Sequence, residues 1–182
     1  QFDDCVWGGM VNPKLAVALT GRSGEALEEY KKLMLKLNNE VVAAAPEDLL
    51  INTHVCRGNY HSTFFSSGAY DSVADLLFGE ENVNAYYLEY DDERSGGFAP
   101  LAKVSGDKKV VLGLVTTKTP ALENKELVIN RIHEAAKYVP LDRLYLSPQC
   151  GFASCEIGNK LTEEEQWAKL KLVKEIAEEV WG

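Results

Sequence analysis

The regular alternation of short apolar runs with longer amphipathic segments most constrains the fold of this sequence. Five short runs have the length and composition of strands, and they occupy residues 2–7, 48–55, 84–90, 109–116 and 143–147. Most of these runs are apolar without a break, which is typical of strands covered on both faces in a parallel sheet. Strands that alternate with helices form right-handed βαβ units. The sequence therefore predicts an α/β fold, either doubly wound or closed as a barrel.

Two amphipathic segments predict helices in the first half of the chain. Residues 23–44 place six apolar side chains on one stripe, namely Leu27, Tyr30, Leu33, Met34, Leu37 and Val41. Residues 69–78 predict a shorter helix that ends at Gly79, since glycine is the usual residue just past a helix.

Two further helices are predicted in the second half. Thr119 is expected to cap the third helix, with Pro120 at its first position and Pro140 as its terminator. Thr162 and Glu165 have the spacing of a capping box, so the last helix is expected to begin there and to run to about Trp181.

The number of units bears on the completeness of the barrel. The chain has five βα units in 182 residues, whereas a closed eight-unit barrel needs about 250 residues. If the fold is a (βα)8 barrel, residues 1–182 supply its last five units as one domain, and the first three units are absent. We expect the unpaired strand edges to lead to self-association or to pairing with a complementing N-terminal portion.

Composition excludes several classes of function. The formal net charge of -9 argues against a nucleic-acid surface, which needs clustered basic residues. No apolar stretch approaches the roughly 20 residues that a membrane span requires, and no signal segment opens the chain. The four cysteines are too sparse for a secreted disulfide scaffold, so reduced thiols and a cytoplasmic location are expected.

Four side chains that can bind a metal each follow a predicted strand. His54 and Cys56 lie where the run LLINTHV ends, Glu89 lies at the end of AYYLEY, and Cys150 comes directly after RLYLSPQ. The carboxyl ends of parallel strands meet at one edge of the sheet, where active sites are built. Zinc prefers thiolate and imidazole ligands, and a carboxylate completes its tetrahedral shell. The sequence therefore predicts a Zn²⁺ site.

Taken singly, each of these residues has an ordinary structural explanation. Glu89 belongs to the acidic run LEYDDER, typical of a solvated loop, and a lone Cys150 is more often a small buried side chain. Only the joint placement favours a site. The remaining cysteines and histidines are interpreted as structural, incidental or surface residues, namely Cys5, Cys155, His61 and His133.

The donor set also indicates a type of chemistry. Two thiolates and one carboxylate make the metal electron-rich and a poor activator of water. Such a centre is better suited to holding a substrate thiol as a thiolate. The oxygen ligand is the most exchangeable one, so we expect Glu89 to give way to a substrate sulfur.

The segments THVCRGN, LEYDDERSGGF and LSPQCGFAS resemble the catalytic C-terminal barrel of the cobalamin-independent methionine synthase family, and in particular its short single-barrel bacterial relatives. The resemblance implies a (βα)8 barrel with zinc held at the positions of His54, Cys56, Glu89 and Cys150. It also implies that homocysteine binds through its sulfur to the zinc and takes the N5-methyl group of a methyltetrahydrofolate, giving methionine. Asp3 matches the residue that binds the amino group of homocysteine.

The sequence departs from the family pattern in the loop after residues 110–115. The family has an Asp and a His where this chain has Thr116 and Lys118. Lys118 is then the candidate proton donor for the leaving nitrogen. The departure leaves the donor open among a folate, a corrinoid protein and a small methylated metabolite.

Two other functions fit the same residues. A zinc-dependent thiol transferase or lyase of the epoxyalkane:coenzyme M type shares the zinc motif. A non-catalytic structural zinc module is the third reading, although structural sites usually have four Cys or His ligands and this one would include a carboxylate.

Overall fold

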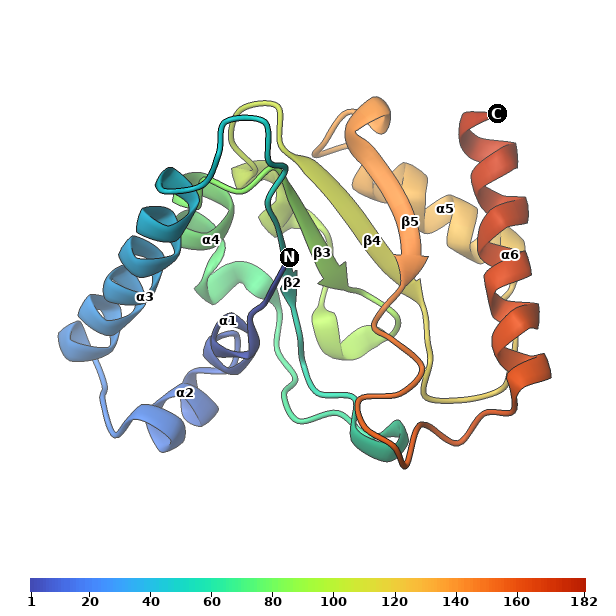
Figure 1. The fold of residues 1–182 in the computed structure, drawn as a ribbon, viewed down its shortest axis with the longest axis horizontal. Helices are drawn as coiled ribbons and strands as arrows, with labels where there is room; N and C mark the ends of the chain where they lie inside the picture. Colours follow the sequence, from blue (N-terminus) through green and yellow to red (C-terminus); the bar gives the residue numbers. More distant parts are fainter.

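A parallel five-stranded sheet forms the centre of the structure, a computed structural model that describes residues 1–182 (Figure 1). Its strands are β1 (Phe2–Asp3), β2 (Asn52–Val55), β3 (Ala85–Glu89), β4 (Lys109–Val115) and β5 (Leu144–Pro148). They neighbour one another in sequence order, and every pair is parallel. A doubly wound sheet reverses its strand order at a switch point, whereas a barrel wall does not. The predicted α/β fold with part of a (βα)8 barrel is confirmed.

Six α-helices accompany the sheet. They are α1 (Cys5–Met10), α2 (Pro13–Thr20), α3 (Glu25–Ala43), α4 (Ala74–Glu80), α5 (Lys125–Ala135) and α6 (Glu163–Trp181). In Figure 1, α3 and α4 lie to the left of the sheet, and α5 and α6 lie to its right. The connection after β3 has only two 3-10 turns, Glu93–Ser95 and Ala99–Lys103, so helices do not follow every strand. None of the six is both long and apolar enough to cross a bilayer.

The first strand is shorter than predicted. The prediction of a strand over residues 2–7 is wrong beyond Asp3, because Asp4 begins α1 instead. The Asp4 side chain accepts hydrogen bonds from the backbone N–H groups of Val6 and Trp7, at 2.8 and 3.2 Å. This N-cap turns the chain out of the sheet immediately after β1.

The second strand and the helix that follows it also begin later than predicted. β2 starts at Asn52 rather than at residue 48, and Leu50 before it is 74% exposed. α4 starts at Ala74, after a 3-10 turn, and Gly79 lies within its last turn rather than beyond it.

The third predicted helix begins five residues later than expected. Thr119 does not cap it; Asn124 does, accepting from the backbone N–H of Leu127 at 3.0 Å. The residues before α5 form a loop that receives the buried ammonium group of Lys169, which donates to the carbonyl of Ala121 at 2.7 Å and to Glu123 at 3.0 Å. This contact with Lys169 holds the residues before α5 as a loop, although Thr119 and Pro120 are typical of a helix start.

Two predicted helices are confirmed. α3 occupies residues within the predicted 23–44, although Leu33, Leu37 and Val41 of its apolar stripe are exposed. α6 begins with the predicted capping box of Thr162 and Glu165. α2 was not predicted, although Asn12 caps it and Pro13 opens it, which is a standard helix start.

Candidate metal site

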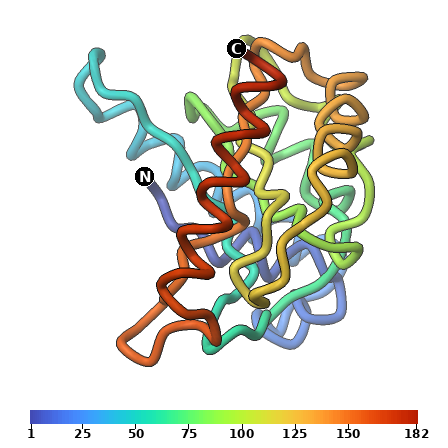
Figure 2. The backbone as a smooth tube through the Cα atoms, turned by 90° about the vertical axis from the view of Figure 1, so that its right-hand side faces the viewer, coloured from blue at the N-terminus to red at the C-terminus, as the bar shows by residue number.

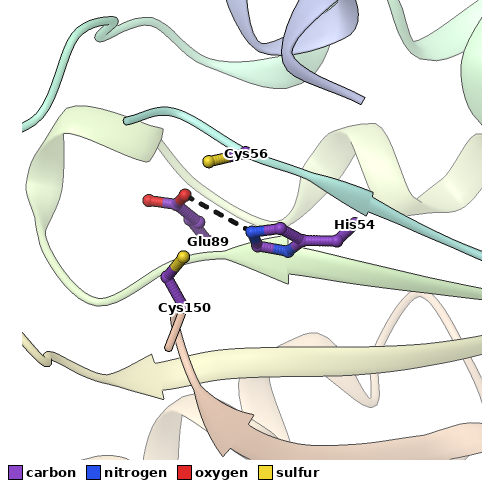
Figure 3. A group of neighbouring side chains, drawn as sticks. All are labelled: His54, Cys56, Glu89 and Cys150. Carbon is purple, nitrogen blue, oxygen red and sulfur yellow. Dashed lines mark ion pairs between the residues drawn. The ribbon is translucent and has the colours of Figure 1, made fainter. Parts of the chain in front are cut away.

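Four potential ligands meet at the carboxyl ends of the strands. One donor atom each from His54, Cys56, Glu89 and Cys150 lies within 4.8 Å of the other three (Figure 3). His54 is on β2, Cys56 follows β2 directly, Glu89 ends β3, and Cys150 comes two residues after β5. The structure thus brings together all four residues that the sequence singled out.

The contacts of these residues fit a tetrahedral cation. Zinc ligands lie about 2.0 to 2.3 Å from the metal, which puts tetrahedral donors within about 4 Å of one another. His54 Nε2 is buried and has no hydrogen-bond partner in the protein. Glu89 Oε1, joined to it by the dashed line in Figure 3, is 3.9 Å away, which is too far for a hydrogen bond. A buried nitrogen without a hydrogen bond is costly, and a metal ion would satisfy it.

Glu89 is fully buried and is fixed by two donors. Its Oε1 accepts from the backbone N–H of Arg57 at 2.7 Å, and its Oε2 accepts from Arg94 Nη2 at 2.9 Å. Arg94 also donates to Asp91 at 2.7 Å and to Asp92. Charge-assisted bonds of this kind set the orientation of a ligand carboxylate.

Arg57, the residue after Cys56, anchors the loop that carries the first thiol. Its side chain is fully buried, donates to the carbonyl of Gly68 at 2.5 Å, and lies over the ring of Tyr70 at 4.1 Å. The Tyr70 hydroxyl in turn accepts from the backbone N–H of Glu89 at 3.1 Å. The ends of β2 and β3 are therefore held together without a metal.

Proximity shifts the acidities of these side chains. A hydrogen bond from Cys150 lowers the pKa of Cys56 to about 4, with His54 acting in the same direction against the effect of burial. The same contact with Cys56 raises the pKa of Cys150. Burial raises the pKa of Glu89, although the Arg57 N–H and Lys118 oppose it. One thiol of this pair is therefore more acidic than an ordinary cysteine, and a bound cation would release the proton that the pair still holds.

A polar hub joins the loops after β2, β4 and β5 near the site, and we define it as the buried residues Asn59, Thr117 and Gln149 together with the half-buried Asn159. Thr117 N–H donates to Gln149 Oε1 at 2.5 Å, and Thr117 Oγ1 donates to the carbonyl of Gly151 at 2.9 Å. Asn59 Nδ2 donates to the same carbonyl at 2.6 Å.

Asn159 connects the far end of the hub. Its Nδ2 donates to Asn59 Oδ1 at 3.0 Å and to the carbonyl of Thr117 at 2.9 Å. In Figure 2 the segment after β5 and the segment after β2 run close together at the lower edge. Gly113 on β4 makes room for this packing, because a Cβ there would lie 2.6 Å from the Cα of Gln149.

Two further predicted residues lie near the four ligands. Asp3 lines a cavity of about 680 Å³ together with His54, Cys56 and Cys150. Lys118 is buried, its Nζ lies 3.9 Å from Glu89 Oε2, and that nitrogen has no hydrogen-bond partner. Lys118 does not line the cavity, so it reaches the site through Glu89.

Cys5 belongs to this region, contrary to its interpretation as an incidental thiol. It lines the same cavity as Cys56, and burial together with that neighbour raises its pKa to about 11. A signal was present in the sequence, since Asp3 and Cys5 have the same two-residue spacing as His54 and Cys56. Cys155, His61 and His133 are not among the four clustered ligands.

Comparison with known proteins agrees with this site. Residues 25–179 match the family model described as the cobalamin-independent synthase catalytic domain. Uncharacterized protein YxjG of Bacillus subtilis is 49% identical over the whole chain, which covers 48% of YxjG. A methionine synthase of Pyrococcus horikoshii is 29% identical over 56% of the chain, which corresponds to 26% of that protein.

Solved structures show the same fold. A crystal structure from Listeria monocytogenes, assigned to the vitamin-B12 independent methionine synthases, matches 99% of the chain and 47% of its own length, with 40% identity and a TM-score of 0.70. The chain thus spans about half the length of YxjG and of this structure. The matched range 25–179 contains all four clustered residues, and the chain belongs to the cobalamin-independent methionine synthase family, in its catalytic domain.

Proposed function

We propose that this chain carries the zinc centre of a methyltransferase that moves a methyl group from a methyltetrahydrofolate-type donor to the thiol of homocysteine, giving methionine. The observation that carries the proposal is the convergence of His54, Cys56, Glu89 and Cys150 within 4.8 Å. Family membership supports the reaction class.

The four residues would hold Zn²⁺, which when bound supplies a thiolate nucleophile at neutral pH by lowering the pKa of a coordinated thiol. The chain itself supplies orientation. The Arg57 N–H and Arg94 hold the Glu89 carboxylate from two sides, and the polar hub fixes the loop that carries Cys150. A fixed shell of this kind reduces the reorganisation needed when a substrate binds.

Asp3 is proposed to bind the amino group of homocysteine. It pairs with His54 in the β1–β2 register and lines the cavity beside the two thiols. Asp3→Asn is expected to raise KM for homocysteine at least about tenfold with a smaller effect on kcat, because it removes a charged contact to the substrate. Steady-state kinetics on the full-length protein measures both constants, and an unchanged KM would remove Asp3 from this role.

Lys118 is proposed as the proton donor to the leaving nitrogen. It stands where the family has a histidine, and its unpartnered Nζ is next to Glu89. Proton transfer by a positioned group contributes typically 10²–10⁴-fold. Lys118→Met is expected to lower kcat by about that factor, whereas Lys118→Arg keeps the charge and serves as the control.

One assay tests the methyl donor and the methyl acceptor together. Methionine formation from homocysteine by the full-length protein is measured with a methyltetrahydrofolate, a methylated corrinoid protein and small methylated metabolites, with a chelator as control. We expect product from the folate and its loss with chelator. Absence of product with every donor would contradict the synthase assignment.

The alternative functions have distinct outcomes. A thiol transferase or lyase of the epoxyalkane:coenzyme M type would bind a thiol other than homocysteine at the metal. A non-catalytic structural module would hold zinc that no thiol perturbs. Titrating the cobalt-loaded protein with several thiols distinguishes these, because thiolate binding changes the visible absorption of cobalt.

The completeness of the barrel and the cellular location of the protein are proposals as well. We propose that residues 1–182 are the last five units of the barrel and that the first three units complement it, either from the same protein or through self-association. β1 and β5 are the two sheet edges that such units would pair with.

We place the protein in the cytoplasm, which the four free cysteines support.

A further inference from the structure

Cys5, the first residue of α1, lies near Cys56 at the carboxyl end of β2. β1 and β2 pair Asp3 with His54, and the next backbone N–H, that of Asp4, donates to the carbonyl of His54 at 2.8 Å. The chain then enters α1 at Cys5, and Gly8, one helical turn later, packs against the backbone of Cys56. Cys5 and Cys56 line the same cavity, so the two residues lie close to each other.

The first turn of α1 rests directly on the backbone at Cys56. A Cβ added to Gly8 would lie 1.9 Å from the carbonyl oxygen of Cys56, so only glycine permits this approach. α1 is therefore held against the strand end, and Cys5, at its first position, has little freedom to move away. Cys5 is exposed, so small reagents reach it from solvent.

We propose that Cys5 and Cys56 form a reversible disulfide when a hydroperoxide enters the cavity, which makes the pair a modification site at the rim of the metal site. The proposal depends on the placement of the thiols and not on the methyltransferase reaction.

The reaction balances with the hydroperoxide as the oxidant. One thiol of the pair transfers two electrons to the O–O bond, gaining an oxygen as sulfenic acid while the hydroperoxide leaves as an alcohol, or as water when it is hydrogen peroxide. The second thiol then attacks the sulfenic sulfur. The S–S bond forms, and the oxygen leaves as water with the proton of the second thiol.

Geometry favours Cys5 over Cys150 as the partner of Cys56. A disulfide requires Cα atoms about 4.4 to 6.8 Å apart, and Cys5 and Cys56 follow β1 and β2, which are immediate neighbours in the sheet. Cys150 follows β5, which is separated from β2 by two strands. Figure 3 shows Cys56 and Cys150 reaching the site from opposite sides. Their sulfur atoms lie within 4.8 Å of each other, so a Cys56–Cys150 disulfide is the competing outcome.

The consequence for the site follows from ligand chemistry. Only a thiolate binds the metal well, so a Cys5–Cys56 disulfide removes one of the four donors. A free Cys56 sulfenic acid would otherwise proceed to sulfinic acid, which ordinary reductants do not reverse. Cys5 therefore converts a permanent lesion into a reversible one.

The test uses peptide mapping of the full-length protein after treatment with hydrogen peroxide and alkylation of the remaining thiols. The protein is examined after removal of metal and again after loading with Zn²⁺. Trypsin separates Cys5 and Cys56 onto different peptides, because Lys14, Lys36 and Arg57 lie around them. Cys5→Ser is the test variant, and Cys155→Ser, which removes another exposed thiol, is its matched control.

In the metal-free wild type we expect a Cys5–Cys56 cross-linked peptide that dithiothreitol reverses, with restored zinc content on reloading. Cys5→Ser should lose this peptide and accumulate at least about fivefold more Cys56 sulfinic acid, whereas Cys155→Ser should behave as wild type. Bound Zn²⁺ should slow the cross-link. A predominant Cys56–Cys150 disulfide, or equal sulfinic acid in wild type and Cys5→Ser, would overturn the proposal. Neither result depends on methionine formation, so failure of the proposed function is seen separately.

Discussion

At the scale of single residues, the candidate site depends on buried charges that are paired before any metal enters. Glu89 and Asp91 have almost no exposed side-chain surface, and both receive hydrogen bonds from Arg94. Removing one partner from a buried ion pair leaves an uncompensated charge, which costs more than the pair itself contributes. Arg94 is therefore a structural requirement of the site as well as a neighbour of a ligand.

Arg94→Met is expected to lower the free energy of unfolding of the metal-free protein by about 3 kcal/mol. Zinc should recover more stability in this variant than in wild type, because the metal provides Glu89 with a new partner. Denaturant unfolding with and without zinc measures both effects. Lys103→Met, which breaks an exposed pair with Asp75, is the control and should cost less than about 1 kcal/mol. Equal losses in the two variants would contradict this account.

A second buried carboxylate, away from the ligands, gives a pH dependence. Burial raises the pKa of Glu81 from 4.5 to about 7, and Asn38 Nδ2 donates to Glu81 at 2.8 Å and to Asp4 at 2.9 Å. The folded protein therefore holds this proton more tightly than the unfolded chain does. The contribution of Glu81 to stability is greatest below pH 4.5, falls as the pH rises to about 7, and is constant above that value.

Glu81→Gln is expected to remove this dependence and to make the protein more stable than wild type at pH 8, by about 3 kcal/mol for a shift of this size. Denaturant midpoints from pH 5 to pH 8 test the expectation. Glu80→Gln changes an exposed neighbour in the same helix turn and should leave the wild-type pH curve unchanged. Parallel curves for wild type and Glu81→Gln would exclude Glu81 as the cause.

At the scale of elements, the loops after β2, β4 and β5 act as one unit through the polar hub. Asn159 is the member farthest along the chain, and its Oδ1 also accepts from the backbone N–H of Ser62 at 2.9 Å. The hub places Gln149 and Gly151 on either side of Cys150, and so it sets the direction of that thiol. Hydrogen-bonded partners of ligands typically affect metal affinity 10- to 100-fold.

Asn159→Ala should therefore weaken zinc affinity by about 10- to 100-fold. The measurement is a competition titration with a chromophoric chelator. Asn39→Ala removes a similar hydrogen-bonded asparagine on α3, which bonds to Glu80 and Asn82, and it should leave zinc affinity unchanged. If both variants bind zinc like wild type, the hub does not position Cys150.

The sequence predicted the strands, the barrel type and all four clustered residues. The spacing of apolar residues and the ligand chemistry of a side chain can both be read from a short stretch of sequence. It failed where distant residues decide the structure. The start of α5 depends on Lys169, which lies more than forty residues downstream. The end of β1 depends on whether Asp4 caps a helix, and Cys5 reaches the site only through the pairing of β1 with β2. The hub could not be predicted from spacing, because its members come from three separate loops.

At the scale of the whole molecule, the sheet has two open edges and an exposed apolar groove beside β1. The groove is lined by Phe2, Leu37, Val41, Leu49 and Leu50, among others. Unpaired parallel strand edges and exposed apolar side chains favour association. This surface explains why Leu37 and Val41, predicted on the buried stripe of α3, are exposed.

Residues 1–182 alone are expected to associate in a concentration-dependent manner, as measured by sedimentation velocity. Leu50→Glu should reduce this association, whereas Leu122→Glu, which changes another exposed leucine in the loop before α5, should not. The complementing N-terminal portion proposed above should replace self-association with a one-to-one complex. A monomer at all concentrations would show that the groove needs no partner.

The central claim is that four side chains far apart in the sequence form one metal site. Titration of the metal-free full-length protein with Co²⁺, followed by visible absorption, tests it most directly. We predict saturation at one equivalent with tetrahedral ligand-field bands and thiolate charge-transfer bands, and their loss in His54→Ala, Cys56→Ser and Cys150→Ser. Glu89→Gln should retain the thiolate bands with shifted ligand-field bands. Octahedral cobalt without thiolate bands, or a spectrum unchanged by these substitutions, would contradict the account.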